Sequence, residues 1–335
     1  MIRKKTIIIA EIGPNHNGNI NIAKKLILAA KRCGADYVKF QTYKTEEVLI
    51  KNLKKADYQI KNTHNKKETQ FEMLKKYEFS QKNFIKLFRF CNKKKIKFLT
   101  TAFDLDSIDF VKRLNLDFFK IPSGEINNLL FLRKIGKFNK KIILSTGMSN
   151  IREINNAFKI LIKSGTSKKN ITILHCNTEY PTPFRDANLK SIISMKKKFK
   201  TSIGYSDHTL GIEASIAAVV FGAQIIEKHF TLNKNMEGPD HKISLEPKEL
   251  KFMINCIRNI EVAIGSGIKK KTQSEKKNIS LVRRSIVAKT NILKGEYFSN
   301  ENLTVKRPAD GKSPLLWDSI IGKKSKKNYL IDEKI

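Results

Sequence analysis

Eight short apolar runs, rich in β-branched residues, recur along this chain, and each leads into polar or charged side chains. Segments with helical periodicity separate the runs. Strands that are covered on both faces need not alternate polar and apolar residues, so such runs are typical of a parallel sheet. The pattern predicts an α/β protein built on a (β/α)8 barrel. The runs cover residues 6–11, 36–42, 97–103, 118–123, 141–147, 171–176, 201–208 and 224–229.

The ends of these runs carry the residues of greatest functional interest. In a (β/α)8 barrel the active site is built from the carboxyl ends of the strands and the loops that follow them. Polar side chains at those ends are therefore candidates for catalysis or binding rather than packing. They are Glu11, Lys39, Thr101, Lys120, Ser123, Ser145, His208 and His229.

The length of the chain, 335 residues, predicts a second and smaller domain after the barrel. A barrel of this kind uses roughly 250 residues. The composition changes near residue 267 to a lysine-rich hydrophilic stretch. We therefore predict a barrel over 1–266, a linker over 267–282 and a small module over 283–335. The stretch 45–77 is longer than a βα loop needs and is expected to form a lid or rim over the site.

The net charge of +35 is a second conspicuous feature. Such a charge can mark a nucleic-acid-binding protein. Here the lysines are spread through nearly every predicted helix, which indicates solvated helix faces rather than a basic patch. No apolar run approaches the roughly 20 residues that cross a bilayer, and the 4 cysteines show no paired spacing. We expect a cytoplasmic protein with reduced thiols and with neither nucleic acid nor membrane as a partner.

A histidine pair is the strongest chemical signal. His208 and His229 end the seventh and eighth runs, so two neighbouring strands would direct imidazoles to one place. Two imidazoles with open positions for water and substrate suit a divalent transition metal that acts as a Lewis acid. The alternative is that each histidine hydrogen-bonds within its own loop. Asp207 and Asp240 are candidate outer partners of the pair.

Lys39 and Lys120 lie inside otherwise apolar runs. Burying an ammonium group without a partner is costly. Both lysines are therefore expected to face the barrel mouth and, together with Ser123 and Ser145, to bind a phosphate or carboxylate. The alternative for each is a lysine whose stem is buried while its ammonium group reaches solvent.

Acidic and loop residues complete the candidate site. Glu11 and Glu125 also follow strands, where a carboxylate can activate water or stabilise a transient cation. A salt bridge with one of the lysines is the alternative for each. Two prolines make the loop after the sixth run rigid, so it could hold Thr178 and Tyr180 over a substrate.

Taken together, these segments resemble the bacterial sialic acid synthase family. The resemblance covers essentially the whole chain, in order, and it is far more specific than any single motif. It extends to the C-terminal module, which is similar to the antifreeze-like (SAF) domain that follows the barrel in that family. The segments that carry it are residues 10–18, 38–42, 120–125, 144–148, 178–184, 204–209, 227–231 and 238–240.

The resemblance implies a reaction and a site. Phosphoenolpyruvate would condense with an N-acetylated hexosamine and water, giving a nine-carbon sugar acid and, by C–O cleavage, phosphate. His208 and His229 would hold a divalent metal, manganese foremost, with magnesium or cobalt as alternatives. Glu11 and Glu125 match acidic positions that manage water and the cationic intermediate. The implied substrate-binding residues are Lys39, Thr101, Lys120, Ser123, Ser145, Thr178, Tyr180, Ser206 and Asp240.

The resemblance also implies an assembly. Arg307 matches an arginine that the SAF domain places over the sugar's N-acetyl group in the other protomer. A shared site of this kind implies a domain-swapped homodimer. Thr178 stands where some members of the family have Asn, so the polar contact there is expected to be rearranged.

Several products and functions compete at this stage. Within the family, the motifs at 178–183 and 238–240 favour N-acetylneuraminate made from N-acetylmannosamine. The alternative is N,N'-diacetyllegionaminate made from 2,4-diacetamido-2,4,6-trideoxymannose, and pseudaminate is less favoured. Outside the family, a metal-dependent barrel lyase would need the histidine pair but not the C-terminal module. A non-enzymatic binding protein driven by charge would adsorb to nucleic acid in a salt-sensitive way.

Overall fold

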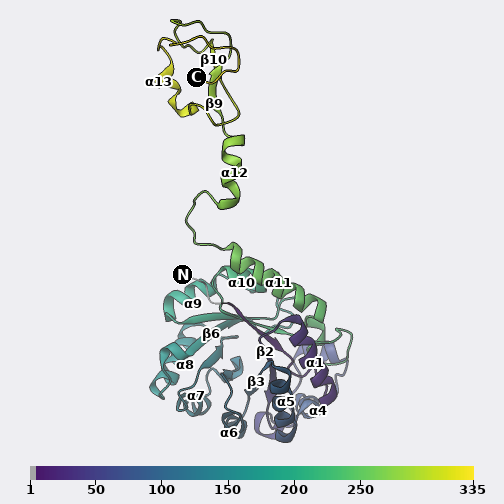
Figure 1. Ribbon diagram of the computed structural model, residues 1–335. Coiled ribbons are helices and arrows are strands. Elements are labelled where there is room, and N and C mark those ends of the chain that lie inside the picture. Colours follow the sequence, from purple (N-terminus) through teal and green to yellow (C-terminus); the bar gives the residue numbers. More distant parts are fainter. Residues whose placement is uncertain (1–4) are drawn as a thin grey trace. The chain divides into compact units, whose positions relative to one another are not determined.

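The computed structural model describes residues 5–335. Eight strands, β1 to β8, close into one parallel barrel in sequence order (Figure 1). The pairing of β8 with β1 runs from Ile225 beside Ile7 to His229 beside Glu11, which completes the ring. The predicted barrel is thereby confirmed. Its strands are β1 (Ile7–Glu11), β2 (Tyr37–Thr42), β3 (Lys97–Ala102), β4 (Phe119–Ile121), β5 (Ile142–Ser145), β6 (Ile171–Cys176), β7 (Ser202–Asp207) and β8 (Ile225–His229).

Helices alternate with the strands and surround the barrel (Figure 1). Their buried faces share one apolar core with the strands, so each strand is covered on its outer side as the apolar runs require. The helices that follow or flank the strands are α1 (Ile20–Cys33), α5 (Gln81–Lys94), α6 (Leu105–Arg113), α7 (Leu129–Gly136), α8 (Ile151–Lys163), α9 (Ser191–Phe199), α10 (Glu213–Val220) and α11 (Pro247–Ala263).

Local sequence signals set where these elements begin and end. The Asn19 side chain accepts hydrogen bonds from the first backbone amides of α1, and Gly34, with a φ of 93°, ends that helix in the left-handed conformation. In β7, a Cβ added at Gly204 would lie 2.6 Å from the backbone oxygen of Ile225. The close approach of β7 to β8 therefore requires glycine at this position.

Residues 45–77, the stretch expected to form a lid or rim, fold into three short helices. These are α2 (Thr45–Val48), α3 (Asp57–Thr63) and α4 (Gln70–Tyr77). We call residues 45–77 the lid segment. Short single-turn helices follow β4, β6 and β8, namely η1 (Ser123–Glu125), η3 (Phe184–Asp186) and η4 (His241–Ile243), and another, η2 (Lys168–Asn170), leads into β6.

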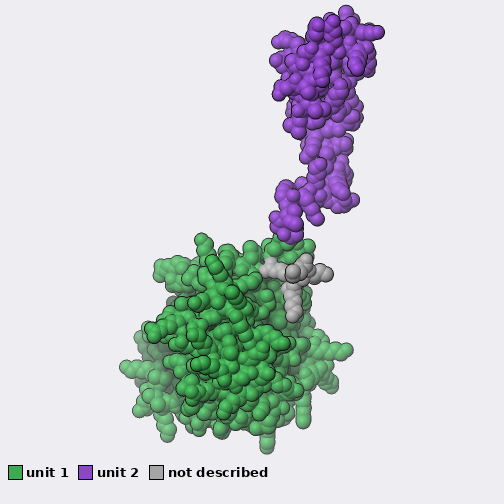
Figure 2. Space-filling view, turned by 90° about the vertical axis from the view of Figure 1, so that its left-hand side faces the viewer, with its two compact units in different colours: residues 1–265 green, residues 266–335 purple. Residues whose placement is uncertain are grey.

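The chain divides into two compact units, the second covering residues 266–335 (Figure 2). The second unit has a small apolar core of its own and an antiparallel pair of strands. The stretch 267–282, predicted as a linker, is in part helical, because Thr272 and Glu275 form a capping box at the start of a helix. The elements of this unit are α12 (Gln273–Val282), β9 (Ser285–Ala288), β10 (Leu303–Lys306), η5 (Pro314–Leu316) and α13 (Trp317–Ile320).

Helix length and apolarity bear on membrane insertion. Among residues 5–335, the structure contains no helix that is both long and apolar enough to cross a bilayer.

Candidate active site

The carboxyl ends of the barrel strands surround a cavity of about 260 Å³. Every strand of the barrel contributes at least one side chain to its wall. The cavity therefore lies at the face where barrel enzymes carry out their chemistry. It brings together every predicted site residue except Glu125, Asp207 and Arg307, namely Glu11, Lys39, Thr101, Lys120, Ser123, Ser145, Thr178, Tyr180, Ser206, His208, His229 and Asp240.

Two lysines and two glutamates at the barrel mouth form one buried cluster of charges. The register of β1 and β2 sets Glu11 beside Lys39, and their side chains form an ion pair. The ammonium group of Lys120 lies 3.0 Å from Oε1 of Glu227, and that of Lys39 lies 3.9 Å from Oε2. All four residues are at most 5% exposed. A buried charge without a partner is strongly destabilising, so each group depends on the others.

The two carboxyl groups of this cluster differ in their affinity for a proton. Burial raises the pKa of Glu11 to about 7, because attraction to Lys39 only partly offsets the loss of water and Glu227 adds repulsion. Burial alone would also raise the pKa of Glu227. The ammonium groups of Lys120 and Lys39 outweigh it and lower that pKa to about 2. One carboxylate is thus firmly ionised while the other is easily neutralised, so the cluster can carry excess positive charge and attract an anion.

Hydroxyl groups lie next to the cluster. Lys39 Nζ donates a hydrogen bond to Thr101 Oγ1 at 2.8 Å, and Ser206 Oγ donates to Glu227 at 3.0 Å. Ser123 Oγ accepts a hydrogen bond from the backbone amide of Gly147 at 2.9 Å. Ser145 Oγ is buried and has no hydrogen-bond partner among the described residues. Because an unsatisfied buried hydroxyl is costly, Ser145 is available to a ligand that enters the cavity.

The two predicted histidines meet as expected from neighbouring strands. The ring centroids of His208 and His229 are 5.4 Å apart, and the Tyr180 ring stacks on His208 at 4.1 Å. Nδ1 of His208 donates to the backbone oxygen of Asn177, which fixes the ring orientation. Nδ1 of His229 lies 3.6 Å from the Asp240 carboxylate.

Both imidazoles are neutral at physiological pH. Burial lowers the pKa of His208 to about 4, and it holds the pKa of His229 well below its usual range. Neutral imidazole is the form that binds a metal ion.

The side chains at the histidine pair can be compared with the ligands that a metal ion requires. His229 Nδ1 is buried and has no hydrogen-bond partner among the described residues. Within residues 5–335 no group of three or more His, Cys, Asp or Glu side chains is arranged to hold a metal ion. Two imidazoles could therefore hold a metal only if its remaining ligands came from water or from a substrate.

Three predicted residues lie elsewhere. Glu125 is outside the cavity wall, in the single turn η1 after β4, where its carboxylate accepts a hydrogen bond from Asn128 at 2.6 Å. Asp207, expected as an outer partner of the histidines, is instead fully buried in an ion pair with Lys228 at 2.9 Å. Adjacent side chains point to opposite faces of a strand, so Asp207 cannot follow Ser206 into the cavity. Arg307 is an exposed residue of the second unit.

Sequence reasoning missed several residues of the cavity wall. Glu227 is central to the charge cluster, and a usable signal existed, because a residue two positions before His229 faces the same side of the strand. Gln41, two positions after Lys39, satisfies the same rule and donates to Glu11 at 3.4 Å. The missed residues from the lid segment, which no strand periodicity reveals, are Tyr58, Gln59, Gln70, Met73 and Leu74.

Comparisons with known proteins agree with this geometry. The NeuB family model matches residues 26–269, and the SAF domain model matches residues 283–333. The chain is 55% identical to an N,N'-diacetyllegionaminic acid synthase of Campylobacter jejuni, over 99% of both chains. It is 41% identical to a synthase of the same name from Legionella pneumophila, over 96% of this chain and 90% of that protein. A crystal structure of an N-acetylneuraminic acid synthetase from Leptospira borgpetersenii is similar with a TM-score of 0.72 at 35% identity, covering 82% of this chain and 90% of that one.

The charge cluster generates a prediction about stability. Glu227→Gln leaves two buried ammonium groups with only the easily neutralised carboxylate of Glu11, so we expect a loss of about 3–5 kcal/mol in the free energy of unfolding. Asp109→Asn breaks the exposed pair with Lys134 and should cost under about 1 kcal/mol. Urea unfolding followed by circular dichroism compares the two variants. Equal losses would show that the cluster is not held together by its charges.

Proposed function

The chain belongs to the NeuB family, and from that premise we propose that it is an enzyme that condenses phosphoenolpyruvate with an acetamido sugar and water, yielding a nine-carbon sugar acid and phosphate. The observation that carries the proposal is the presence, in one cavity, of the Lys39–Lys120 cluster and the His208–His229 pair. The first suits a phosphate and a carboxylate, and the second suits a carbonyl oxygen.

For the sugar we propose 2,4-diacetamido-2,4,6-trideoxymannose, which makes the product N,N'-diacetyllegionaminate. Two relatives that are 55% and 41% identical, each matching nearly the whole chain, are named as synthases of that product. N-acetylmannosamine, favoured by the motifs alone, remains the second candidate, supported by the likeness to the Leptospira synthetase at 35% identity.

The cluster residues would bind and orient phosphoenolpyruvate. Lys39 and Lys120 pair with its phosphate and carboxylate, and the free hydroxyl of Ser145 donates to an oxygen of the same ligand. Ligand oxygens would thereby replace water in a buried site, where charge-assisted hydrogen bonds are strong. The enol carbon C3 is held facing the sugar aldehyde, so the bimolecular step becomes effectively intramolecular.

The bonds of the proposed reaction balance as follows. C3 of phosphoenolpyruvate forms a bond to C1 of the open-chain sugar, and the aldehyde oxygen takes up a proton. Water adds its oxygen to C2 and releases one proton. The bond from C2 to the phosphate oxygen then breaks, and C2 becomes a ketone as the proton of its new hydroxyl passes to the departing phosphate. Glu11 lies between Lys39 and His229 in the barrel register, where its carboxylate is placed to take the proton that the water releases.

We also propose that His208 and His229 hold a divalent metal, Mn²⁺ foremost and Mg²⁺ or Co²⁺ as alternatives. The support is the pair of neutral imidazoles from neighbouring strands in the wall of one cavity. Such a metal supplies Lewis acidity that polarises the aldehyde oxygen. Asp240, 3.6 Å from His229, orients that ring.

The substrate assignment is tested by phosphate release. With phosphoenolpyruvate and Mn²⁺, we expect turnover of 2,4-diacetamido-2,4,6-trideoxymannose with at least a tenfold higher kcat/KM than N-acetylmannosamine, because one extra recognised group is worth about this much. Mass spectrometry of the product identifies the acid formed. Preference for N-acetylmannosamine would make that sugar the assigned substrate, and turnover of neither sugar would overturn the proposed function.

Metal binding can be measured without turnover. Titration of Mn²⁺ followed by electron paramagnetic resonance should show that His208→Asn and His229→Asn each weaken binding by roughly tenfold or more, because each removes one of two protein ligands. His64→Asn is the matched control, because His64 is an exposed lid residue outside the cavity wall. Unchanged Mn²⁺ affinity in the first two variants would contradict the metal site.

We further propose that the enzyme is a domain-swapped homodimer in which Arg307 of the second unit completes the partner's cavity. The support is the match of residues 283–333 to the SAF domain and the exposure of Arg307. A site assembled from two protomers needs each of them to be intact.

Mixing two inactive variants tests this assembly. Lys120→Gln and Arg307→Ala should each be nearly inactive alone. Refolded together, they should recover about a quarter of wild-type activity, because about half of the dimers are mixed and each mixed dimer has one complete site. Sedimentation confirms that dimers form. No recovery in mixed dimers would show that Arg307 does not act in the partner's site.

A further inference from the structure

The lid segment supplies a cavity wall whose chemistry differs from that of the strand ends. The strand ends contribute ammonium groups, carboxylates, hydroxyls and imidazoles, whereas the lid contributes two amides and apolar side chains. None of the lid residues that line the cavity carries a charge. They are Tyr58, Gln59, Gln70, Met73 and Leu74.

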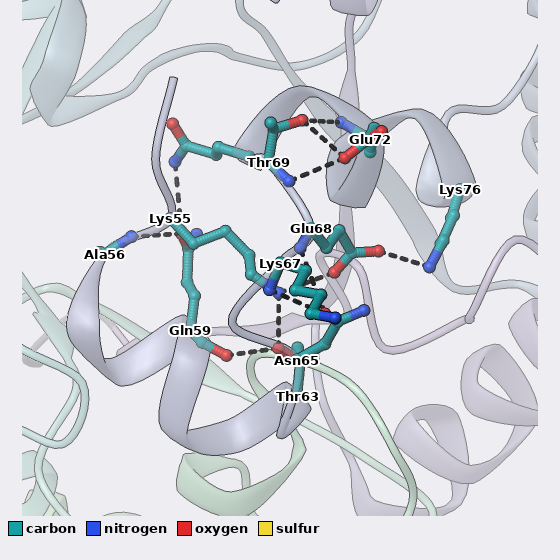
Figure 3. A network of polar contacts seen from close by, with 11 residues as sticks. Lys55, Ala56, Gln59, Thr63, Asn65, Lys67, Glu68, Thr69, Glu72 and Lys76 are labelled. Atoms are coloured by element: carbon teal, nitrogen blue, oxygen red, sulfur yellow. Dashed lines mark hydrogen bonds and ion pairs between the residues drawn. The ribbon is translucent and has the colours of Figure 1, made fainter. Parts of the chain in front are cut away.

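Buried polar contacts hold this wall in place (Figure 3). The ammonium group of Lys55 lies 2.7 Å from Glu68 and donates to Thr63 at 2.9 Å. The Lys55 side chain is 0% exposed and that of Glu68 is 7% exposed. The Thr63 hydroxyl in turn donates to the backbone oxygen of Gln59 at 2.7 Å. A buried pair satisfied in this way specifies one arrangement of the segment.

Two further contacts fasten the lid segment to the loops of the barrel. Asn62 Nδ2 donates to the backbone oxygen of Pro239 at 2.6 Å, next to Asp240 in the cavity wall. The Tyr58 ring stacks on Tyr180 with centroids 5.0 Å apart. The wall is therefore continuous with the histidine side of the site and is held in place by contacts within the chain.

The two amides of the wall form a matched pair. Gln59 is 7% exposed, and its Oε1 accepts hydrogen bonds from the Ala56 backbone amide at 3.0 Å and from Gln70 Nε2 at 3.4 Å. The NH2 group of Gln59 and the carbonyl oxygen of Gln70 take no part in these contacts, and both residues line the cavity. An acetamido group presents one carbonyl acceptor and one N–H donor, which is the complementary pattern.

The direction of the sugar follows from the proposed reaction. Its C1 must lie beside phosphoenolpyruvate and the histidine pair, so C4 to C6 extend away from the ammonium groups. A C6 methyl group is favoured by burial against Met73 and Leu74, whereas a phosphate group would lose water without meeting a charged residue of the lid wall. The buried ammonium group of Lys55 is paired with Glu68, and Lys55 is not among the residues that line the cavity.

From these contacts we propose that the lid wall is the sugar-specificity element of this enzyme. Gln59 and Gln70 hydrogen-bond the C4 acetamido group, and Met73 and Leu74 receive the C6 methyl group. The inference rests on the proposed function and deepens it, since it assigns the second acetamido and deoxy positions of the sugar to named residues outside the barrel strands.

Substitution of Gln59 tests the proposal. Gln59→Glu keeps the shape and the oxygen bonded to Ala56 but removes the NH2 donor, and Gln59→Met removes both. We expect kcat/KM for the diacetamido sugar to fall roughly 10- to 100-fold in each variant, because an unpaired acetamido carbonyl is penalised. The value for N-acetylmannosamine, which has a C4 hydroxyl, should change less than about threefold, and KM for phosphoenolpyruvate should stay constant.

A matched control and a second readout keep folding defects apart from specificity. Lys61→Gln changes an exposed residue of the same helix, α3, and should leave every constant unchanged. The rise in Tm on adding each sugar to the full-length protein measures binding without turnover. The diacetamido sugar should lose its stabilising effect in both Gln59 variants, whereas N-acetylmannosamine should retain its own.

The outcomes separate this inference from the function on which it rests. Suppose that the wild-type enzyme prefers the diacetamido sugar, but the Gln59 variants lower kcat/KM equally for both sugars or for neither. That result would overturn the lid assignment alone. A wild-type enzyme that prefers N-acetylmannosamine, or turns over neither sugar, would overturn the substrate assignment and this inference with it.

Discussion

Two ammonium groups are buried away from water at the mouth of the barrel, and the rest of the site depends on how their charge is compensated. Lys39 and Lys120 can be buried there because two glutamates are buried with them: Glu11 pairs with Lys39 from the neighbouring strand β1, and Glu227 pairs with Lys120 from β8. The two carboxyl groups do not compensate the lysines equally, because the pKa of Glu11 is raised whereas that of Glu227 is lowered. The cluster is thereby stable in the folded chain and still receptive to an anion.

The closure of the barrel creates this arrangement. Glu11 and Glu227 lie on β1 and β8, which are far apart in sequence and become neighbours when the last strand pairs with the first. The same closure sets Glu11 beside His229, so the charge cluster and the histidine pair share one wall. A closed sheet has no free edge, and this rigidity lets side chains from different strands meet with fixed geometry.

The barrel strands and the lid segment contribute different kinds of side chain to the cavity. The strand ends carry the charged groups and the histidine pair. The cavity-lining residues of the lid segment are neutral amides and apolar or aromatic side chains, the kind of surface that we propose recognises the distal part of a sugar. Loops tolerate change better than strands, so specificity at this wall could vary without loss of the strand-end residues. The buried Lys55–Glu68 pair gives the lid the order that such a role requires.

Much of this protein followed from its sequence alone. We could predict the barrel, the small C-terminal module, the approach of His208 to His229 and most strand-end residues of the cavity. Apolar runs and helical periodicity reveal the order of strands and helices, and the carboxyl ends of the strands in a parallel barrel meet at one face. Other features depended on packing between segments distant in the chain. The pairing of Glu227 with Lys120, the burial of Asp207 against Lys228 and the displacement of Glu125 into η1 arise from which face of a strand or turn each side chain occupies. Gln70, Met73 and Leu74 of the lid wall share one face of α4, but nothing local in the sequence brings that face to the cavity. Only the tertiary structure decided that Gln59 lines the cavity, because α3 is held there by contacts with distant segments, from Asn62 to Pro239 and from Tyr58 to Tyr180.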